Sequence, residues 1–288
     1  MNKVISIGNQ EFDKIRENDY FYVDKTGFIK EWWESGDDVT LITRPRRFGK
    51  TLNMDMLKCF FSNQYTGRAD LFEGLSIWKE EKYRELQGQY PVIFVSFADV
   101  KERDYESAVR KIKHILVDLY LQYEFLKKNF SESEQMRYRQ ISYNMDNVAA
   151  QDALKSLAAL LSSYYGKKAI ILLDEYDTPM QEAYIHGYWE EFTGFMRSMF
   201  NATFKTNPYL ERAVMTGITR VSKESMFSDL NNLNVVTMTS KEYATAFGFT
   251  GEEVFAALDS YGMSEEKEKV KKWYDGFVIG PVKDIYNP

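Results

Sequence analysis

The sequence has very little cysteine and histidine. Its 288 residues include one cysteine, Cys59, and two histidines, His114 and His186. A single cysteine cannot form a disulfide within the chain, and these three residues do not supply the clustered ligands of a structural zinc site. The composition therefore excludes a disulfide-stapled fold and a zinc-binding module.

Long apolar runs are also missing. The first residues, MNKVISIGNQEFDKI, lack the apolar core of a secretory signal, and no run approaches the length that spans a bilayer. We predict a cytoplasmic protein that does not enter a membrane.

Positive charge is not in excess. The formal net charge is -6 and the sequence pI is about 5.3, which argues against a surface that binds nucleic acid everywhere but leaves a local basic groove open. Hydrophobic residues make up 44% of the chain and charged residues 28%, as in globular proteins. The length suits one large domain, or a core domain with a smaller one.

Short apolar runs rich in β-branched residues alternate with longer stretches of helical period. This alternation is typical of an α/β fold. The three middle runs are nearly continuous in apolar residues, as in parallel strands covered by helices on both faces. We expect five strands, at residues 39–43, 91–97, 169–174, 212–218 and 233–238.

Helical spacing of apolar residues predicts the intervening helices. They fall directly after residues 49–51 and at 104–128, 147–165 and 188–205, and three short helices are predicted within 240–275. We therefore predict a core with an N-terminal extension, residues 1–239, and a small helical, lid-like subdomain, residues 240–288.

The stretch LITRPRRFGKTLNMDMLKCFF, residues 41–61, resembles a phosphate-binding loop with Arg44 in place of the usual first glycine. In such loops backbone N–H groups and a helix N-terminus hold the phosphates, the lysine reaches them, and the Ser or Thr hydroxyl binds Mg²⁺. Gly49, Lys50 and Thr51 retain these parts after a predicted strand and before a predicted helix. We expect the nucleotide to be bound by Arg44, Pro45, Arg46, Arg47, Phe48, Gly49, Lys50, Thr51 and Leu52.

A second motif, AIILLDEYD at residues 169–177, is an apolar strand that ends in acids, as in a Walker B element. Asp174 is predicted to hold Mg²⁺ together with Thr51, and Glu175 to polarise the attacking water. Asp177 would either assist the metal or cap the helix after Pro179. The alternative is an ordinary strand followed by a polar loop, but the two motifs in one chain favour a Mg-ATP site.

The number of predicted strands indicates which kind of P-loop protein this is. One strand lies between the two motifs and another follows the second, which, with Glu175, matches the additional-strand, catalytic-glutamate division of P-loop ATPases. The expected sheet is mainly parallel, with five strands in the order 5-1-4-3-2. The strand at 212–218 would then end near the γ-phosphate, where Thr216, Thr219 and Arg220 are candidate sensors. The alternative is an ordinary strand-end threonine and a surface arginine.

Other residues near the loop have two interpretations each. The arginines at 44, 46 and 47 suit phosphate by geometry and charge, although an acidic partner or nucleic acid would suit them too. Tyr22, Asp24 and Lys25 would line an adenine or ribose pocket, or Asp24 would cap the helix that begins near Thr26. The chain has no Asn/Thr-Lys-x-Asp guanine-reading motif, which favours ATP.

Several motifs, in order along essentially the whole chain, resemble the bacterial AAA-ATPase-like family. They are IGNQEFDKIRENDYFYVDKTGFIKE, the Arg-Pro-Arg-Arg-Phe-Gly-Lys-Thr loop, LLDEYDTP, TGITRVSKESMFSDLNNL and the final KWYDGF and YNP. The resemblance implies that an arginine in the first position of the loop is the normal form. Members of this family often continue into a domain similar to PD-(D/E)XK nucleases, and nothing after Pro288 supplies one in this sequence.

The sequence thus predicts a Mg-ATP-binding ATPase that acts as a switch or motor, coupled to an effector domain or a protein partner or working as an oligomer. One alternative is a scaffold that binds nucleotide without hydrolysing it. Another is a DNA-processing module, which the net charge does not support.

Overall fold

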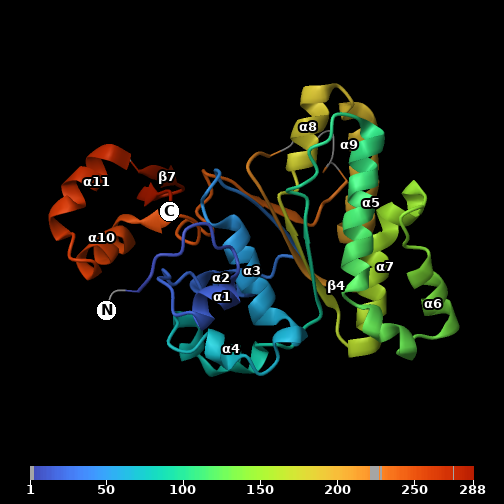
Figure 1. Ribbon diagram of the computed structural model, residues 1–288, viewed down its shortest axis with the longest axis horizontal. Helices are drawn as coiled ribbons and strands as arrows, with labels where there is room; N and C mark the ends of the chain where they lie inside the picture. Colours follow the sequence, from blue (N-terminus) through green and yellow to red (C-terminus); the bar gives the residue numbers. More distant parts are fainter. Residues whose placement is uncertain (1–2, 221–226, 228, 275) are drawn as a thin grey trace. The chain divides into compact units, whose positions relative to one another are not determined.

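The computed structural model describes residues 3–220, 227, 229–274 and 276–288 (Figure 1). Among these residues, no helix combines the length and the apolar character that crossing a membrane requires.

The chain divides into two units, each assembled from separate stretches of sequence. The first consists of Met1–Gly36, Thr43–Gln89 and Val235–Pro288, and the second of Asp37–Ile42 and Tyr90–Asn234. The predicted boundary between residues 239 and 240 stays a prediction.

The expected α/β fold is confirmed. The five-stranded sheet has the order β2-β3-β4-β1-β5, which is the predicted order read from the opposite edge. β2 pairs in parallel with β3, and β3 in parallel with β4. The observed bounds differ from the predicted ones by at most two residues: β1 (Val39–Thr43), β2 (Val92–Ser96), β3 (Ala169–Asp174), β4 (Leu210–Gly217) and β5 (Leu233–Val236).

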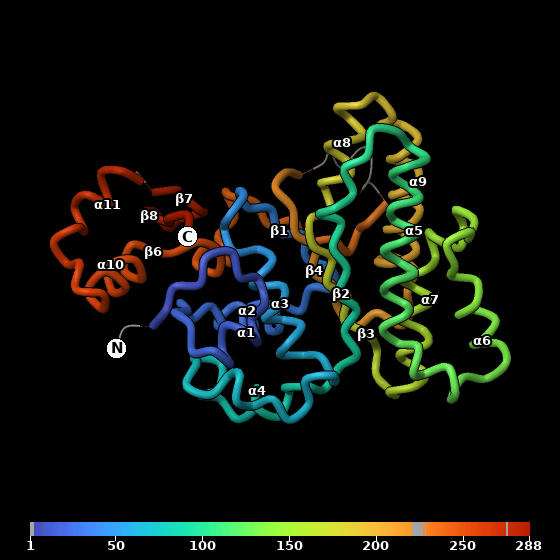
Figure 2. Tube along the Cα trace, in the orientation of Figure 1, coloured from blue at the N-terminus to red at the C-terminus, as the bar shows by residue number. Residues whose placement is uncertain are grey.

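Burial explains why the strands of the second unit could be recognised. All six residues of β3 are buried, so its sequence is continuously apolar up to Asp174. Helix α7 packs against β3 and against its neighbours α5 and α9, which Figure 2 shows running side by side. The helices of this unit are α5 (Tyr105–Leu121), α6 (Glu132–Arg139), α7 (Asn147–Tyr165), α8 (Thr178–His186) and α9 (Trp189–Phe200).

Two helices of the second unit are shorter than predicted. α5 ends at Leu121 and is followed by a 3₁₀ segment, Glu124–Asn129, because the buried Tyr123 turns inward and its hydroxyl donates to the carbonyl oxygen of Val92 at 2.8 Å. α9 ends at Phe200 and continues as a π-helical turn over Asn201–Lys205.

The first unit has a core rich in aromatic rings. Phe12 stacks on Phe72 with ring centroids 5.2 Å apart, Phe60 meets Phe72 edge-on at 5.1 Å, and Trp32 meets Phe61 edge-on at 5.5 Å. The helices that carry or surround these rings are α1 (Phe12–Glu17), α2 (Gly27–Ser35), α3 (Lys50–Phe61) and α4 (Glu81–Leu86).

The C-terminal part contains helices, as expected, but also strands that the sequence analysis did not predict. Beside α10 (Gly251–Ser260) and α11 (Lys267–Tyr274), this part contains a three-stranded sheet of order β6-β8-β7 with antiparallel pairing. Its strands are short and partly exposed, so they carry no clear hydrophobic alternation: β6 (Phe249–Thr250), β7 (Phe277–Ile279) and β8 (Val282–Tyr286).

Candidate functional site

The loop between β1 and α3 has the backbone of an anion-binding turn. Arg47 and Gly49 have positive φ angles of 64° and 74°, and α3 begins at Lys50 directly after Gly49. A Cβ atom added to Gly49 would meet nothing within 4 Å, so space is open beside this position. The first turn of α3 carries no acidic residue, which leaves its partial positive charge for an anion.

Lys50 folds back over its own loop. Its Nζ atom donates to the carbonyl oxygens of Arg44 at 3.2 Å and Pro45 at 3.0 Å, and the residue is 5% exposed. The ammonium group therefore lies inside the turn that starts the helix. A phosphate bound in this turn would lie close to the Lys50 ammonium group.

Arg44 points away from solvent into the first unit. Its guanidinium is fully buried and donates to the carbonyl oxygens of Thr237 at 2.9 Å, Glu242 at 3.3 Å and Tyr243 at 3.4 Å, as well as to its neighbour Thr43 at 3.0 Å. Burial lowers the pKa of Arg44 to about 10, against the opposing influence of the Glu31 carboxylate. The side chain remains charged at neutral pH and ties the start of the loop to residues 237–243. That it contacts nucleotide stays a prediction.

The other residues of the loop differ in exposure. Arg46 and Arg47 are exposed, and Pro45, Thr51 and Leu52 are half-buried. Phe48 is fully buried, its carbonyl oxygen accepts from the Gly248 N–H at 3.1 Å, and its ring meets Phe277 edge-on at 5.0 Å. The loop thus exposes two arginine side chains, while the buried Phe48 holds its backbone in place.

Asp174 and Glu175 end β3 in the second unit. Asp174 is 1% exposed and accepts a hydrogen bond from the hydroxyl of Thr216, which is itself fully buried on β4. Glu175 is half-buried and has a positive φ of 55°, a strained conformation for a residue with a side chain. The Thr178 hydroxyl donates to Glu175 Oε2 at 2.7 Å. The structure therefore joins Thr216 to the predicted metal ligand, and holds Glu175 in a fixed turn next to it.

Thr219 and Arg220 follow the end of β4 and are exposed. The predicted sensor role of Arg220 stays a prediction, as do the predicted roles of Lys50, Thr51, Asp174, Glu175 and Thr216.

Asp177 does not cap the helix that follows it, which was one of its two predicted roles. It occupies the position before α8, but its side chain makes no capping bond to that helix. The carboxylate is instead fully buried against the segment after β4, where it accepts from the backbone N–H groups of Ile218 and Thr219 at 3.0 and 2.7 Å. The signal in the sequence is the third acid of Asp-Glu-Tyr-Asp, though the acid alone does not reveal its partners.

Tyr22, Asp24 and Lys25 are engaged within the first unit. Asp24 accepts from the Thr26 N–H at 2.9 Å and the Ser76 N–H at 2.7 Å. The Nζ of Lys25, which is 8% exposed, donates to Glu253 Oε2 at 2.6 Å and to the Thr245 carbonyl oxygen at 2.8 Å. Asp24 thus bonds to the turn before α2, whose N-cap is Thr26 and not Asp24 as predicted. The alternative, that these residues line an adenine or ribose pocket, stays a prediction.

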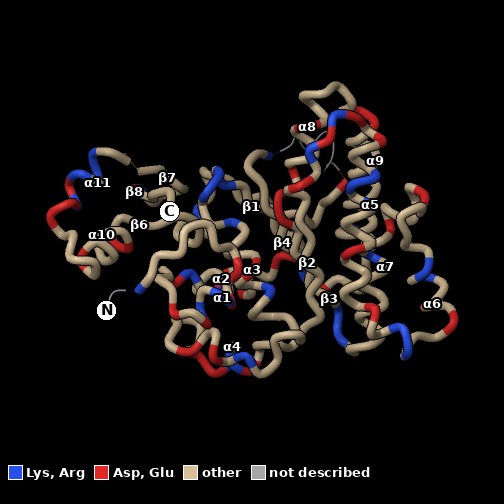
Figure 3. Tube along the Cα trace, viewed as in Figure 1, with Lys and Arg blue, Asp and Glu red and all other residues tan. Residues whose placement is uncertain are grey.

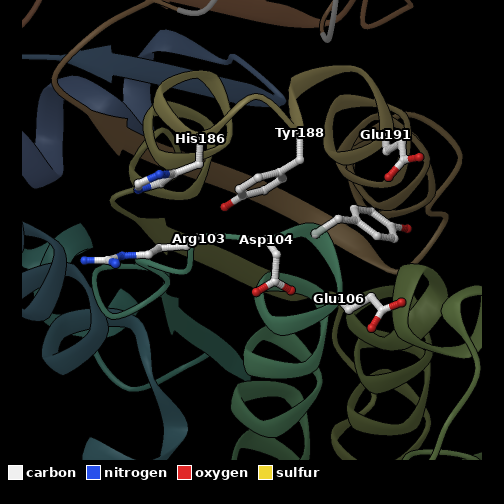
Figure 4. A pocket seen from close by; sticks show the side chains of 7 residues that line it. Arg103, Asp104, Glu106, His186, Tyr188 and Glu191 are labelled. Carbon is white, nitrogen blue, oxygen red and sulfur yellow. The ribbon is translucent and has the colours of Figure 1, made fainter.

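A separate hollow of about 480 Å³ lies in the second unit, where the start of α5 faces the end of α8 and the start of α9 (Figure 4). None of the predicted nucleotide-site residues lines it. Its lining is Arg103, Asp104, Tyr105, Glu106, His186, Tyr188 and Glu191.

Protein side chains alone do not form a complete metal centre. Among the residues that the structure describes, no group of three or more His, Cys, Asp or Glu side chains is arranged to hold a metal ion. Mg²⁺ bound with a nucleotide usually takes much of its coordination from phosphate and water oxygens rather than from a full set of side chains.

Comparisons with known proteins show the family of the chain. A family model described as AAA-ATPase-like, predicted AAA-ATPase, matches residues 6–227. The chain is also 28% identical, over 288 aligned residues, to an uncharacterized protein in the vnfD 5′ region of Azotobacter chroococcum mcd 1. That match covers 99% of this chain and 50% of the relative, so the chain spans about half of the relative's length.

Proposed function

Because the chain belongs to the AAA-ATPase-like family, we propose that it binds Mg-ATP and hydrolyses it to ADP and phosphate. The family supports nucleotide hydrolysis in general terms, and the arrangement of residues within each unit supports the specific roles that follow.

The loop from Arg44 to Leu52 is the proposed phosphate site. Lys50 already lies within hydrogen-bonding distance of two loop carbonyl oxygens. A bound γ-phosphate would offer its ammonium group a charged acceptor instead, and charge-assisted hydrogen bonds are stronger than those to carbonyls. The exposed Arg46 and Arg47 add positive charge at the mouth of the loop.

Thr51 and Asp174 are the proposed protein ligands of Mg²⁺, directly or through water. A hydroxyl and a carboxylate are hard oxygen donors, which fit this ion. The bound ion would draw electron density from the phosphate oxygens and so stabilise the charge that develops on them.

Glu175 is the proposed group that orients the attacking water. In the reaction the water oxygen forms a bond to the γ-phosphorus, the bond from that phosphorus to the bridging oxygen breaks, and ADP leaves with the electron pair. The Glu175 carboxylate would accept a hydrogen bond from the water and take up its proton. Thr216 and Arg220 are the proposed sensors of the phosphate. Thr216 would act through its hydrogen bond to Asp174, and the Arg220 guanidinium would stabilise the negative charge that develops on the phosphate.

One observation carries this proposal: the strand order. β1, which leads into Gly49-Lys50-Thr51, and β3, which ends at Asp174, lie on either side of β4, which ends at Thr216 and Gly217. In open α/β sheets, ligands bind outside the carboxyl ends of the strands. All the proposed roles belong to residues that end these three strands or follow them along the chain.

A hydrolysis assay with two variants tests the proposal. Glu175→Gln should keep Mg-ATP affinity within about twofold and lower phosphate release about 100-fold or more, because it removes the group that accepts the proton. Lys50→Ala should weaken nucleotide binding itself. Glu190→Gln, an exposed acid on α9, is the matched control and should behave as wild type. Wild-type protein that binds Mg-ATP but releases no more phosphate than Glu175→Gln would be a scaffold, and the proposal would be wrong.

The proposed ATPase would work as a switch or motor in the cytoplasm, coupled to an effector domain, a protein partner or further copies of itself. Lys and Arg positions are interspersed with Asp and Glu positions in both units (Figure 3), which suits a protein partner better than a nucleic acid backbone. The same assay with added DNA tests this preference, since stimulation by DNA would point to a nucleic acid effector.

A further inference from the structure

The loop after β3 is bonded, residue by residue, to the end of β4. The Thr216 hydroxyl donates to Asp174. The Tyr176 N–H donates to the Thr216 carbonyl oxygen at 3.0 Å, and the Tyr176 hydroxyl donates to the Thr219 carbonyl oxygen at 2.8 Å. Both segments lie in the second unit, so the contacts join two strand ends within one body.

Asp177 makes the densest of these contacts. Four donors converge on its Oδ2 atom: the N–H of Ile218 at 3.0 Å, the N–H and hydroxyl of Thr219 at 2.7 and 2.8 Å, and the side-chain amide of Gln181 at 2.9 Å. The residue is fully buried. A buried carboxylate that accepts two backbone N–H bonds holds that backbone in one position, because releasing it would leave both donors and the charge unsatisfied.

The second carboxylate oxygen shows how closely the two segments approach. Asp177 Oδ1 is buried and has no hydrogen-bond partner in the part of the chain that the structure describes. It sits 2.6 Å from where a Cβ atom would stand on Gly217, and the Tyr176 ring is equally close, at 2.6 Å. Only glycine fits at position 217, and the space it leaves is filled by this oxygen and the tyrosine ring.

We propose that Asp177 is a positioning residue for the hydrolysis suggested above: it fixes the segment Thr216–Arg220 against the turn that holds Glu175. The inference rests on the proposed function, because positioning matters only if Glu175 acts on a water. Glu175 has the strained φ of 55°, and a strained turn keeps its shape only where its surroundings impose it. The bonds from Tyr176 and Asp177, the two residues that follow, supply that constraint.

This role predicts a particular kinetic pattern. By the proposal Asp177 does not contact the nucleotide, so its loss should leave Mg-ATP affinity and KM within about twofold. The position of Glu175 relative to the segment Thr216–Arg220 should no longer be fixed, so kcat should fall at least tenfold.

Three variants separate positioning from other roles. Asp177→Ala removes the carboxylate, and Asp177→Asn keeps its shape and one acceptor oxygen. Gly217→Ala removes no polar group but forces a methyl between the two segments. Asp146→Ala is the matched control, because Asp146 accepts the Ala149 N–H at 2.7 Å as the cap of α7 in the same unit, away from β4. Each variant is measured for stability in urea, Mg-ATP affinity, Mg²⁺ dependence, kcat and KM.

Amide hydrogen exchange at Ile218 and Thr219 gives a readout that does not depend on turnover. Both amides should be protected in wild type and exchange faster in Asp177→Ala, with Asp177→Asn in between. Asp146→Ala should lower stability without changing these two amides or kcat.

A lower kcat with unchanged KM in Asp177→Ala and Gly217→Ala, partly restored in Asp177→Asn, supports the inference. Unchanged kcat in folded Asp177→Asn and Gly217→Ala overturns it, as does unchanged exchange at Ile218 and Thr219. If Asp177→Asn needed a higher Mg²⁺ concentration for half-maximal activity, Asp177 would be a metal ligand, and the inference would also be overturned. A wild-type chain that binds Mg-ATP without turnover is a different result, since it removes the proposed function and the inference with it.

Discussion

The hydroxyl of Thr216 donates a hydrogen bond to Oδ1 of Asp174, and both side chains are buried at the ends of the adjacent strands β4 and β3. A threonine here does two things that a valine of the same shape cannot. It satisfies one lone pair of a buried carboxylate, and it sets the direction of the oxygens that would face a metal ion.

Thr216→Val should therefore destabilise the protein and weaken its response to Mg²⁺. Leaving a buried carboxylate with one hydrogen bond fewer costs about 1–3 kcal/mol in the free energy of unfolding. Urea denaturation measures this loss, and a titration of nucleotide affinity against Mg²⁺ measures the second effect. Thr216→Ser keeps the hydroxyl and is the control. Equal stability of the valine and serine variants would show that the bond contributes nothing.

Arg44→Lys should lower stability by roughly 2–4 kcal/mol, although it keeps the charge. Lysine has no planar fork that reaches the carbonyl oxygens of Thr237, Glu242 and Tyr243 together, so it would leave buried acceptors unpaired. Arg46→Lys is the matched control, because Arg46 is exposed in the same loop and should change stability by no more than about 0.5 kcal/mol.

Nucleotide affinity separates the two arginines further. With both variants folded, Mg-ATP affinity of Arg44→Lys close to that of wild type would show that Arg44 anchors the loop without contacting the nucleotide. A large loss of affinity in the folded Arg44→Lys variant would instead make Arg44 a direct nucleotide contact.

Features that depend on neighbouring residues in the chain could be predicted from the sequence, and contacts between residues far apart in the chain could not. β3 is buried on both faces, so its sequence is a continuous apolar run up to Asp174 that stands out locally. β1 is equally buried, and only threonines interrupt its apolar residues. Asp174 could be chosen because it ends such a run, and Lys50 because it belongs to a Gly-Lys-Thr motif between a predicted strand and a predicted helix. β7, with two exposed residues out of three, leaves no comparable pattern.

The partners of Arg44 and Asp177 could not be predicted in the same way. Arg44 donates to backbone carbonyl oxygens 193 to 199 residues away, and Asp177 accepts from backbone N–H groups 41 and 42 residues away. Every residue except proline offers such backbone groups, so the sequence of the partner segment carries no mark of the contact. The sequence therefore suggested a nucleotide contact for Arg44, which stays a prediction, but could not reveal that its guanidinium is bonded inside the first unit.

Gly49→Ala should destabilise the loop through its backbone alone. Its φ of 74° is costly for a residue with a Cβ, but nothing within 4 Å would clash with that atom, so the expected loss is about 1–2 kcal/mol from strain. Gly27→Ala is a clean comparison, because Gly27 has equally open space in the first turn of α2 without a positive φ. That control should be neutral or stabilising by up to about 1 kcal/mol. Equal stabilities of the two variants in urea would contradict the strain at Gly49.

Asp24 should make part of the stability depend on pH. Burial disfavours its charged form, but hydrogen bonds from Thr26 and Ser76 outweigh that effect and lower the pKa of Asp24 below its usual 3.8. The folded state then binds fewer protons than the unfolded state near that pH, so the contribution is present above about pH 4 and is lost as pH falls through the lowered value. Asp24→Ala should cost about 1–2 kcal/mol at pH 7, the usual effect of losing side-chain bonds to backbone N–H groups, and less at pH 3.

Urea denaturation of wild type and Asp24→Ala at pH 7 and pH 3 measures the change in that difference. Asp70→Ala is the control, because Asp70 is exposed and pairs with Arg68 on the surface at 2.9 Å. It should change stability by less than about 1 kcal/mol at neutral pH, since exposed ion pairs contribute little. If Asp24→Ala destabilised the protein equally at both pH values, the ionised carboxylate would not be the source of the effect, and a neutral contact of the same side chain would have to explain it.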